Sequence, residues 1–291
     1  MKETTVPNIF KFCLVYLPEK KLRTYRKHKW LILPALAGIV FALTLILRQH
    51  PGFVETWYAQ RIYPFIASLL STISFVLPFS LDDSFYAILI LMPVVLLVQL
   101  FTKRIKWKAA GKFLLNTIAT VYILFYVFWG FNYFRSPLPD RLGIKDREAD
   151  TEEFVQFMQQ YITELNQLHC DFDTVDKTEI DRLIEESYQQ LAPVLKFEYP
   201  MGKRPDKTIT FSGFYAKSGI TGYFGPFFNE VHVNKKILPI EYPYVLAHEK
   251  AHQLGITSEA EANFYAWLVC LNSSSQQIRY SAKLFISFHF F

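Results

Sequence analysis

The residues best suited to chemistry in this 291-residue chain are His248, Glu249 and His252, which form the pattern HExxH. On an α-helix, residues four apart share a face, so both imidazoles can bind one zinc ion. A glutamate directly after the first histidine can hold a water molecule at the metal and act as its general base. The pattern therefore predicts one Zn²⁺ ion as cofactor and hydrolysis with Glu249 as the catalytic residue.

Two consecutive helices must position these residues. Pro243 near the start and Gly255 just past the end predict a helix over residues 241–254. Ser258, followed three residues later by Glu261, resembles a capping box that opens the next helix. Gly255 permits a sharp turn between them, so the second helix can return to the histidine face.

A catalytic zinc ion needs a third protein ligand and one open position. Glu259 on the second helix is the predicted third ligand. Glu261 is the alternative, although its role as capping partner is favoured over ligation. Asn263 lies one turn after Glu259, where its amide oxygen can orient His248 through the second imidazole nitrogen.

This order of ligands resembles the gluzincins, in which a Glu ligand on the following helix precedes an Asp by four residues. Asn263 replaces that Asp here, so it can accept a hydrogen bond but does not raise ligand basicity as a carboxylate does. Only six residues separate His252 from Glu259, far fewer than in thermolysin-type enzymes. Ser258 occupies the position at which metzincins place their third ligand. The resemblance implies a compact, gluzincin-like metallopeptidase that acts on a peptide or protein substrate.

A zincin also needs a strand that binds substrate through its backbone and a donor that stabilises the oxyanion. The candidates for the donor are Tyr223, His232 and Tyr265, although aromatic packing is the favoured explanation for the two tyrosines and a position on the strand surface for His232. The predicted substrate edge strand consists of Glu230, Val231, His232, Val233 and Asn234.

The second half of the chain predicts an α+β domain, mainly helical with a small β-sheet, over residues 150–291. A linker rich in prolines and charges, residues 135–149, precedes it. Helices are expected over 150–168 and 176–195, strands over 207–211 and 230–234, and a hairpin or ordered loop over 212–229, before the two helices of the site.

Three apolar segments in the first half are long enough to cross about 30 Å of hydrocarbon as helices. They are residues 30–47, 85–101 and 113–134, and the last ends in aromatic residues that suit a membrane interface. They predict a multi-pass membrane domain over residues 30–134, after a basic cytoplasmic segment, residues 1–29. The lipid bilayer is therefore a predicted partner.

A fourth uncharged segment, residues 62–81, is ambiguous because it carries several hydroxyl side chains and two prolines. The basic segments 1–29 and 102–112 both face the cytoplasm if three helices span and 62–81 lies in the interface. We expect this arrangement, which places residues after 134 outside the cytoplasm. A fourth span over 62–81 would instead turn the catalytic domain toward the cytoplasm.

The charge is unevenly distributed. Residues 1–133 hold 15 Lys and Arg against 5 Asp and Glu, and residues 134–291 hold 16 against 21. The positive charge accompanies apolar segments and not a polar binding face, so no nucleic-acid partner is predicted. Hydrophobic residues make up 51% of the chain, which excludes a disordered chain, a coiled coil or a collagen-like repeat.

Four segments resemble an uncharacterised, DUF-type family of bacterial membrane-anchored proteins that carry this HExxH motif. They are residues 218–227, 229–234, 247–255 and 259–264. The resemblance implies the inner membrane of a bacterium but no substrate. It also implies further helices after Cys270, so residues 284–291 raise the expectation of a truncated or altered end.

Two other functions compete with a peptidase. One is a catalytically silent membrane sensor or scaffold that zinc stabilises, which the Asn at position 263 favours. The other is a zinc hydrolase of a non-peptide envelope amide, which only the shape of the site can distinguish. The sequence does not indicate the oligomeric state.

Overall fold

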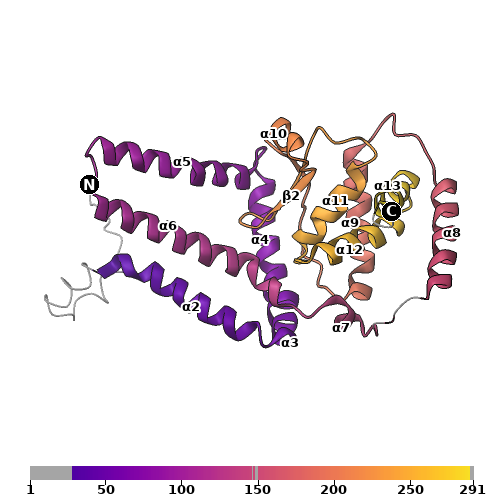
Figure 1. The fold of residues 1–291 in the computed structure, drawn as a ribbon, viewed down its shortest axis with the longest axis horizontal. Helices are drawn as coiled ribbons and strands as arrows, with labels where there is room; N and C mark the ends of the chain where they lie inside the picture. Colours follow the sequence, from indigo (N-terminus) through magenta and orange to yellow (C-terminus); the bar gives the residue numbers. More distant parts are fainter. Residues whose placement is uncertain (1–27, 146, 148–149, 289–291) are drawn as a thin grey trace, which may run out of the picture.

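The computed structural model describes residues 28–145, 147 and 150–288. Long helices extend from one side of the molecule, and shorter helices pack around a small sheet on the other (Figure 1). The long helices are α2 (Ile32–Leu47), α5 (Leu81–Phe101) and α6 (Trp107–Phe128). The architecture is mostly helical with one three-stranded sheet, as predicted for the fold in outline.

Within the described residues, three helices are long and apolar enough to span a membrane: Lys29–Leu47, which combines the 3₁₀ turn η2 (Lys29–Leu31) with α2, and also α5 and α6. Their number confirms the prediction, but the third predicted segment, 113–134, was misplaced. Helix α6 ends at Phe128, and the chain continues as a 3₁₀ helix, η4 (Gly130–Phe134). Trp129 between them leaves helical geometry, with φ −153°.

Helix α5 begins at Leu81, four residues before the predicted apolar segment. Ser80 accepts a hydrogen bond from the Asp83 backbone N–H as N-cap, and Asp82 and Asp83 lie in the first turn. Carboxylates are favourable there because the helix dipole is positive at its N-terminus. The polar residues Asp82–Ser84 therefore lie outside the predicted apolar segment but still belong to the helix.

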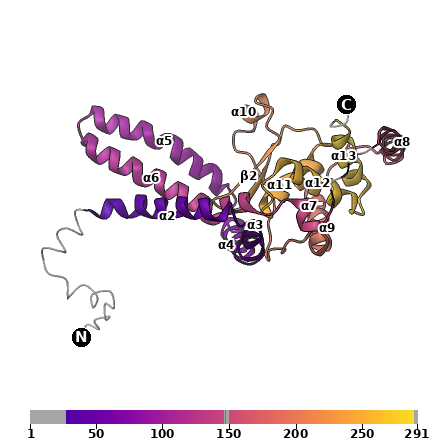
Figure 2. The same cartoon turned by 60° about the horizontal axis from the view of Figure 1, so that its bottom comes forward.

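The ambiguous segment, residues 62–81, contains helix α4 (Tyr63–Phe75), which follows the short α3 (Pro51–Phe53) and a π-helix, η3 (Val54–Ile62). With 13 residues, α4 is about 20 Å long and too short to cross the hydrocarbon core. It runs across the ends of the long helices and is seen nearly end-on in Figure 2. This orientation agrees with the interfacial alternative.

The predicted linker, residues 135–149, includes a short helix, α7 (Leu138–Leu142), whose Leu138 and Arg141 side chains are buried. The remaining helices of this half are α8 (Thr151–Gln167), α9 (Lys177–Leu195), α10 (Ser212–Lys217), α11 (Tyr242–Gln253), α12 (Glu259–Leu271) and α13 (Gln276–Ser287). Helix α8 lies at the outer edge of this half and contacts α13, where its buried Tyr161 donates to the Lys283 carbonyl at 2.7 Å (Figure 1).

The sheet has the order β1–β3–β2, with β1 (Lys207–Thr208) parallel and β2 (Gly222–Gly225) antiparallel to β3 (Glu230–Val233). Strands β2 and β3 form a hairpin in which Gly222 pairs with Val233 and Gly225 with Glu230. The hairpin was expected within residues 212–229, but the first part of that segment is helix α10.

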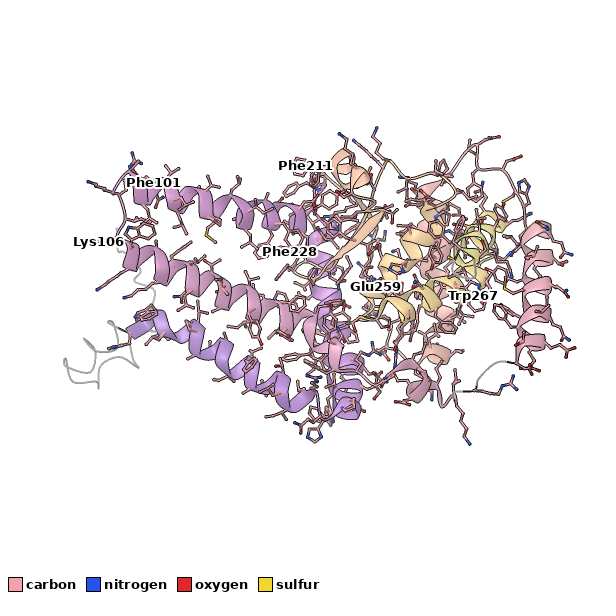
Figure 3. The ribbon with its side chains drawn as sticks, in the orientation of Figure 1. Phe101, Lys106, Phe211, Phe228, Glu259 and Trp267 are labelled. Carbon is pink, nitrogen blue, oxygen red and sulfur yellow. The ribbon has the colours of Figure 1, made fainter. Side chains whose placement is uncertain are left out.

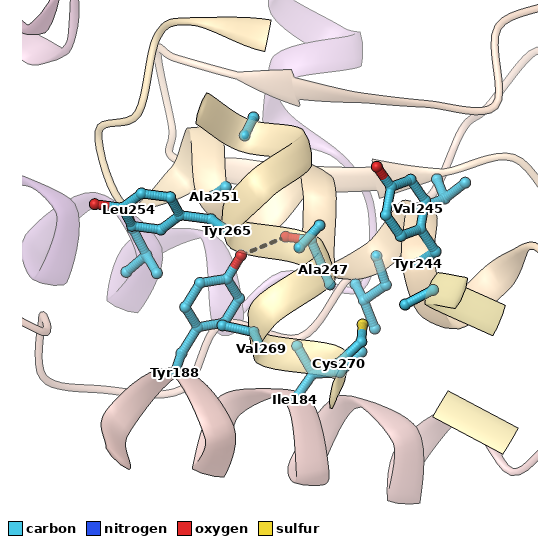
Figure 4. Close-up of a cluster of buried hydrophobic side chains, with 14 of the residues drawn as sticks. Ile184, Tyr188, Tyr244, Val245, Ala247, Ala251, Leu254, Tyr265, Val269 and Cys270 are labelled. Carbon is cyan, nitrogen blue, oxygen red and sulfur yellow. Dashed lines mark hydrogen bonds between the residues drawn. The ribbon is translucent and has the colours of Figure 1, made fainter. Parts of the chain in front are cut away.

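The core of the C-terminal half, residues 135–288, surrounds α11, which is buried along nearly its whole length. Val231 and Val233 of β3 cover one side of it, and α9, α12 and α13 cover the others. Tyr188 of α9 is fully buried and donates a hydrogen bond to the Ala247 carbonyl at 2.6 Å (Figure 4). Contacts with β3, α9, α12 and α13 therefore fix the position of α11 in the C-terminal half.

Candidate metal centre

Gly255 makes the turn that joins α11 to α12. Its φ of +84° lies in the left-handed region, which glycine adopts without strain. A Cβ atom here would also lie 2.9 Å from the Tyr63 ring and 3.1 Å from the Asn132 amide. Both the conformation and the packing require glycine, and the resulting turn brings the N-terminus of α12 back beside α11.

The three predicted ligands meet at this turn. His248 Nε2 lies 3.2 Å from His252 Nε2 and 3.2 Å from Glu259 Oε2, and His252 Nε2 lies 3.5 Å from Glu259 Oε1. Ligand atoms that bind a tetrahedral zinc ion at about 2.0–2.1 Å lie about 3.3–3.4 Å apart. The residues present could therefore hold a single zinc ion. Figure 3 shows Glu259 on the side of the C-terminal half that faces the long helices.

Burial differs among the three ligands. The His248 and His252 side chains are 16% and 10% exposed, whereas the Glu259 side chain is 76% exposed. Burial, followed by the neighbouring His252, lowers the pKa of His248. Neutral imidazole is the form that binds metal, so this environment favours ligation.

The outer hydrogen bonds of the two histidines are unequal. His252 Nδ1 lies 2.7 Å from the Ile256 carbonyl, which requires a proton on Nδ1 and leaves the Nε2 lone pair free. His248 Nδ1 is buried and makes no hydrogen bond of normal geometry within the described residues. Asn263 interacts with the His248 ring, but its Oδ1 accepts a hydrogen bond from Tyr244 at 3.0 Å. The predicted orienting role of Asn263 is therefore only partly fulfilled.

Glu249 lies beside the three ligands and is 7% exposed. Burial, and secondly the Glu259 carboxylate, raise the pKa of Glu249 to about 8. Gly222 of strand β2 faces this carboxyl group so closely that a Cβ atom would lie 2.9 Å from Glu249 Cγ and Oε1. The absence of a side chain at position 222 leaves room for the candidate base.

The ligands and Glu249 open into one cavity of about 420 Å³. Strand β2 forms one wall through Gly222, Tyr223 and Phe224. A second wall comes from the end of α6 and the residues that follow it, which belong to the long-helix half, residues 28–134. The residues of that second wall are Phe125 in the last turn of α6, and Trp129 and Tyr133 after it. The candidate site therefore lies between the two halves of the molecule.

The C-terminal carbonyls of α11 are bound by side chains of the other half. Trp129 donates to the His252 carbonyl at 2.9 Å, and Tyr63 donates to the Gln253 carbonyl at 2.7 Å. Arg135 donates to the Gly255 carbonyl at 3.1 Å and forms a buried ion pair with Glu55. These bonds satisfy carbonyls that a helix end leaves unpaired, and they couple the position of His252 to the long-helix half.

The alternative third ligand, Glu261, lies elsewhere. Its carboxylate accepts hydrogen bonds from the Leu138 backbone N–H and from Arg141. The backbone N–H of Glu261 donates to Ser258, as expected of a capping residue. An acid that pairs with α7 cannot complete the histidine pair, so the geometry leaves Glu259 as the third candidate ligand.

The three predicted oxyanion donors are engaged in other contacts. Tyr265 is fully buried and donates to the Leu195 carbonyl at 3.0 Å. His232 is fully buried, with Nε2 2.7 Å from Ser80 Oγ. Tyr223 lines the cavity, but its hydroxyl group donates to Asp83. None of these polar groups is directed at the ligands.

The predicted substrate edge strand was wrong. Strand β3 is the central strand and not an edge strand. It pairs with β2 along Glu230–Val233 and with β1 at His232 and Val233, and Asn234 follows directly after them. Strand β2 is the edge strand that lines the cavity. Sequence reasoning missed it because its glycines and aromatic residues resemble a loop.

Sequence reasoning also missed Trp129 and Tyr133, which were assigned to an interfacial aromatic belt. Tyr133 lines the cavity, and burial together with the Glu259 carboxylate raises its pKa. No pattern in the sequence distinguishes these two residues from their aromatic neighbours.

Glu230 and His232 form a second cluster on the opposite face of the sheet, at the N-terminus of α5. The Glu230 carboxylate accepts hydrogen bonds from Ser74, Ser80, Lys207 and two backbone N–H groups. Burial alone would raise the pKa of Glu230, but the bonds from His232, Lys207 and Ser74 hold it well below the usual range. The cluster joins the sheet to α4 and α5.

The fold and the site define a mainly helical protein with candidate membrane-spanning helices and a His/His/Glu group that could hold a metal ion. Residues 58–291 match the model of a protein family of unknown function, DUF3810, and the chain belongs to this family. The match includes the second and third apolar helices as well as the whole site. No curated protein and no solved structure matches the chain.

Proposed function

We propose that this protein is a membrane-anchored, zinc-dependent metallopeptidase. The observation that carries the proposal is the convergence of His248, His252 and Glu259 at separations of 3.2–3.5 Å, beside a buried glutamate and inside an open cavity. Two neutral imidazoles and one carboxylate, with space left for a fourth ligand, are typical of catalytic zinc sites.

Bound zinc would supply a Lewis acid and lower the pKa of a coordinated water molecule. Glu249 would accept the proton of that water and deliver it to the departing amine, which is the role of a general base and then a general acid. Its buried position in contact with the Gly222 backbone keeps the carboxyl group directed into the cavity.

Strand β2 would bind the substrate. Its outer edge has no partner strand within the sheet, so its backbone can pair with an extended peptide. Tyr133 would supply the donor for the oxyanion, because it presents a phenol to the same cavity from the opposite wall.

The site would lie outside the cytoplasm. The basic loop that joins α5 to α6 lies at the end of these helices away from the candidate site, where Figure 3 labels Phe101 and Lys106. By the positive-inside rule this loop faces the cytoplasm, which places the C-terminal half on the other side of the inner membrane. In a variant whose three native cysteines are replaced by serine, a cysteine introduced at Lys103 should then react with an impermeant maleimide only after the cells are opened.

The decisive experiment is zinc analysis and peptide hydrolysis by the purified full-length protein in detergent. The wild type should contain one zinc ion per chain, and Glu259→Ala should lose it. Glu261→Gln, the matched control, should retain it. Glu249→Gln should keep zinc and lose hydrolysis. Zinc-free wild-type protein, or full hydrolysis by Glu249→Gln, would refute the proposal.

A zinc-stabilised scaffold without turnover is the second candidate. The observation that favours it is the amide of Asn263 beside the His248 ring, since second-shell carboxylates normally orient such ligands. One zinc ion per chain together with no cleavage of any peptide in a diverse library would favour the scaffold over the peptidase.

A further inference from the structure

The cavity at the candidate metal centre faces the long helices. Phe125 belongs to the last turn of α6, and Trp129 and Tyr133 follow it directly. A substrate that reaches the three ligands from this side passes the end of a candidate membrane-spanning helix. This position suits a substrate that is already at the membrane surface better than one that arrives from solution.

A second cavity, an apolar groove between α5 and α6, leads to the same place. It has a volume of about 490 Å³, and its lining includes Leu89 and Met92 of α5 and Leu114, Ile118 and Val121 of α6. Phe125 lines both the groove and the metal cavity, and Phe227 of the groove follows Pro226 of the metal cavity. The two cavities therefore share a wall at the end of α6.

The dimensions of the groove match half a bilayer. From Leu114 to Phe125, α6 rises about 16 Å at about 1.5 Å per residue. The hydrocarbon core is about 30 Å thick, so the groove covers the half of it beside the metal centre. A further apolar cavity between α5 and α6, which shares Met92 with the groove, covers the half beside the basic loop. An occupant of the groove would therefore emerge from the membrane directly at the three ligands.

We propose, on the basis of the peptidase function above, that the substrate is a membrane-spanning polypeptide. The outer half of its transmembrane helix packs into the groove between α5 and α6, and the residues that follow this helix enter the metal cavity as an extended chain. A polypeptide must be helical in the groove because the apolar lining offers no partners for its backbone. Beyond Phe125 it reaches strand β2, whose free edge binds extended backbone.

Phe125 is the shared wall of the two cavities, so a polypeptide that leaves the groove has only to pass this residue to reach the metal cavity, and this adjacency favours a polypeptide over a phospholipid tail. The molecule that presents a peptide bond to the metal must extend away from it, and the groove provides an apolar path from that point. A lipid tail fills the groove equally well but presents no peptide bond. A lipid-anchored peptide is therefore the alternative that the experiment has to separate.

The test uses the full-length protein reconstituted in nanodiscs and a peptide library with a randomised eight-residue segment. The segment is attached to a transmembrane helix of about 20 Leu and Ala residues, to a palmitoyl chain, or to neither. We expect kcat/KM to be at least 100-fold higher with the helix than without an anchor. Equal cleavage of the free and helix-anchored libraries would overturn the inference, and preference for the palmitoyl form would replace the helix by a lipid anchor.

Two adjacent leucines of α6 offer a matched pair of variants. Leu114 lines the groove and Leu115 lies outside it, and they are 41% and 43% exposed. Leu114→Trp should obstruct the groove and lower kcat/KM for the helix-anchored library at least tenfold, whereas Leu115→Trp should leave it unchanged. Equal effects of the two variants would remove the groove from the proposal.

A binding measurement separates this inference from the peptidase proposal. In the inactive Glu249→Gln background, a photo-crosslinking benzoylphenylalanine at position 114 should label the helix-anchored library, and one at position 115 should not. Crosslinking at 114 without hydrolysis by the wild type would contradict the peptidase but retain the groove. Hydrolysis of the library with equal labelling at both positions would retain the peptidase and overturn the groove.

Discussion

Two clusters of histidine and glutamate lie on opposite faces of the same small sheet, and their environments differ. At the candidate metal centre, the Glu259 side chain is 76% exposed and its neighbours are two imidazole nitrogens. At the N-terminus of α5, the Glu230 side chain is 1% exposed and is surrounded by donors, among them Lys207 and Ser80. The glutamate of the first cluster can bind a ligand, whereas the glutamate of the second already accepts hydrogen bonds from neighbouring side chains.

The difference teaches that residue type alone does not identify a site. Glu230 and His232 lie 3.2 Å apart, as close as His248 and Glu259. The carboxylate of Glu230 already accepts hydrogen bonds from side chains and from the start of α5, so a metal ion would have to displace them. Free lone pairs that point into a cavity distinguish the candidate centre from this structural cluster.

The largest expected effect is on zinc content. His252→Ala should reduce the zinc content from one ion per chain to less than a tenth of that value, because only two ligands remain. His232→Gln should retain the full zinc content, since His232 Nε2 faces Ser80 and Glu230. Mass spectrometric metal analysis of both purified variants checks the contrast, and loss of zinc from His232→Gln would abolish it.

The second prediction concerns stability without metal. Glu230→Gln should destabilise the protein by about 3 kcal/mol, because the variant leaves Lys207 without its buried counter-charge. Glu259→Gln should change the unfolding free energy by less than about 0.5 kcal/mol, as expected of an exposed group. Thermal unfolding in detergent with a chelator measures both. Similar melting temperatures for the two variants would contradict the assignment of Glu230 to a structural role.

The third prediction is a pH dependence that arises from the same group. Since folding lowers the pKa of Glu230, its contribution to stability is complete above the unfolded pKa of about 4.3 and is lost as the pH falls below it. The stability difference between wild type and Glu230→Gln should therefore be constant from pH 5 to 7 and shrink below about pH 4. Unfolding curves of chelated protein across this range provide the measurement, and a difference that grows on acidification would have the wrong sign.

The smallest effect is expected at Gly222. Gly222→Ala places a Cβ atom 2.9 Å from Glu249 Cγ and Oε1 and 2.9 Å from the His232 carbonyl, so both the candidate base and the β2–β3 hairpin must shift. We expect about a tenfold loss of kcat, or about 1.4 kcal/mol in the barrier, with zinc content unchanged. Gly213→Ala in α10 is the matched control, because a Cβ atom there meets nothing within 4 Å, and it should retain zinc and hydrolysis. An unaltered kcat in Gly222→Ala would show that β2 does not constrain the position of Glu249.

Much of the candidate site was predictable because its geometry is local. The spacing of His248 and His252 on one helix, Gly255 at its end and Glu259 after the next cap require only the helical period and one turn. The structure brings these donors together as that spacing predicts. The three apolar helices were predictable for the same reason, since length and composition are properties of a continuous segment.

Other features could not be read from the chain because they depend on distant contacts. The order of strands makes β3 central and β2 the free edge, and nothing within either strand specifies its neighbours. The donors at the end of α11 come from residues more than 100 positions away, Trp129 and Tyr63 among them. Their aromatic rings looked like parts of a membrane interface until the fold placed their N–H and O–H groups against carbonyls.

The sequence by itself determined that this protein combines apolar, bilayer-length helices with a mainly helical second half, and that two histidines and a glutamate can share one ion. Tertiary structure alone decided which glutamate is exposed to a cavity, which strand edge is free and which aromatic residues bind the carbonyls at the end of α11. The physical reason is that helix periodicity and capping act over a few residues, whereas burial and the satisfaction of carbonyls depend on the packing of segments that are remote in the chain.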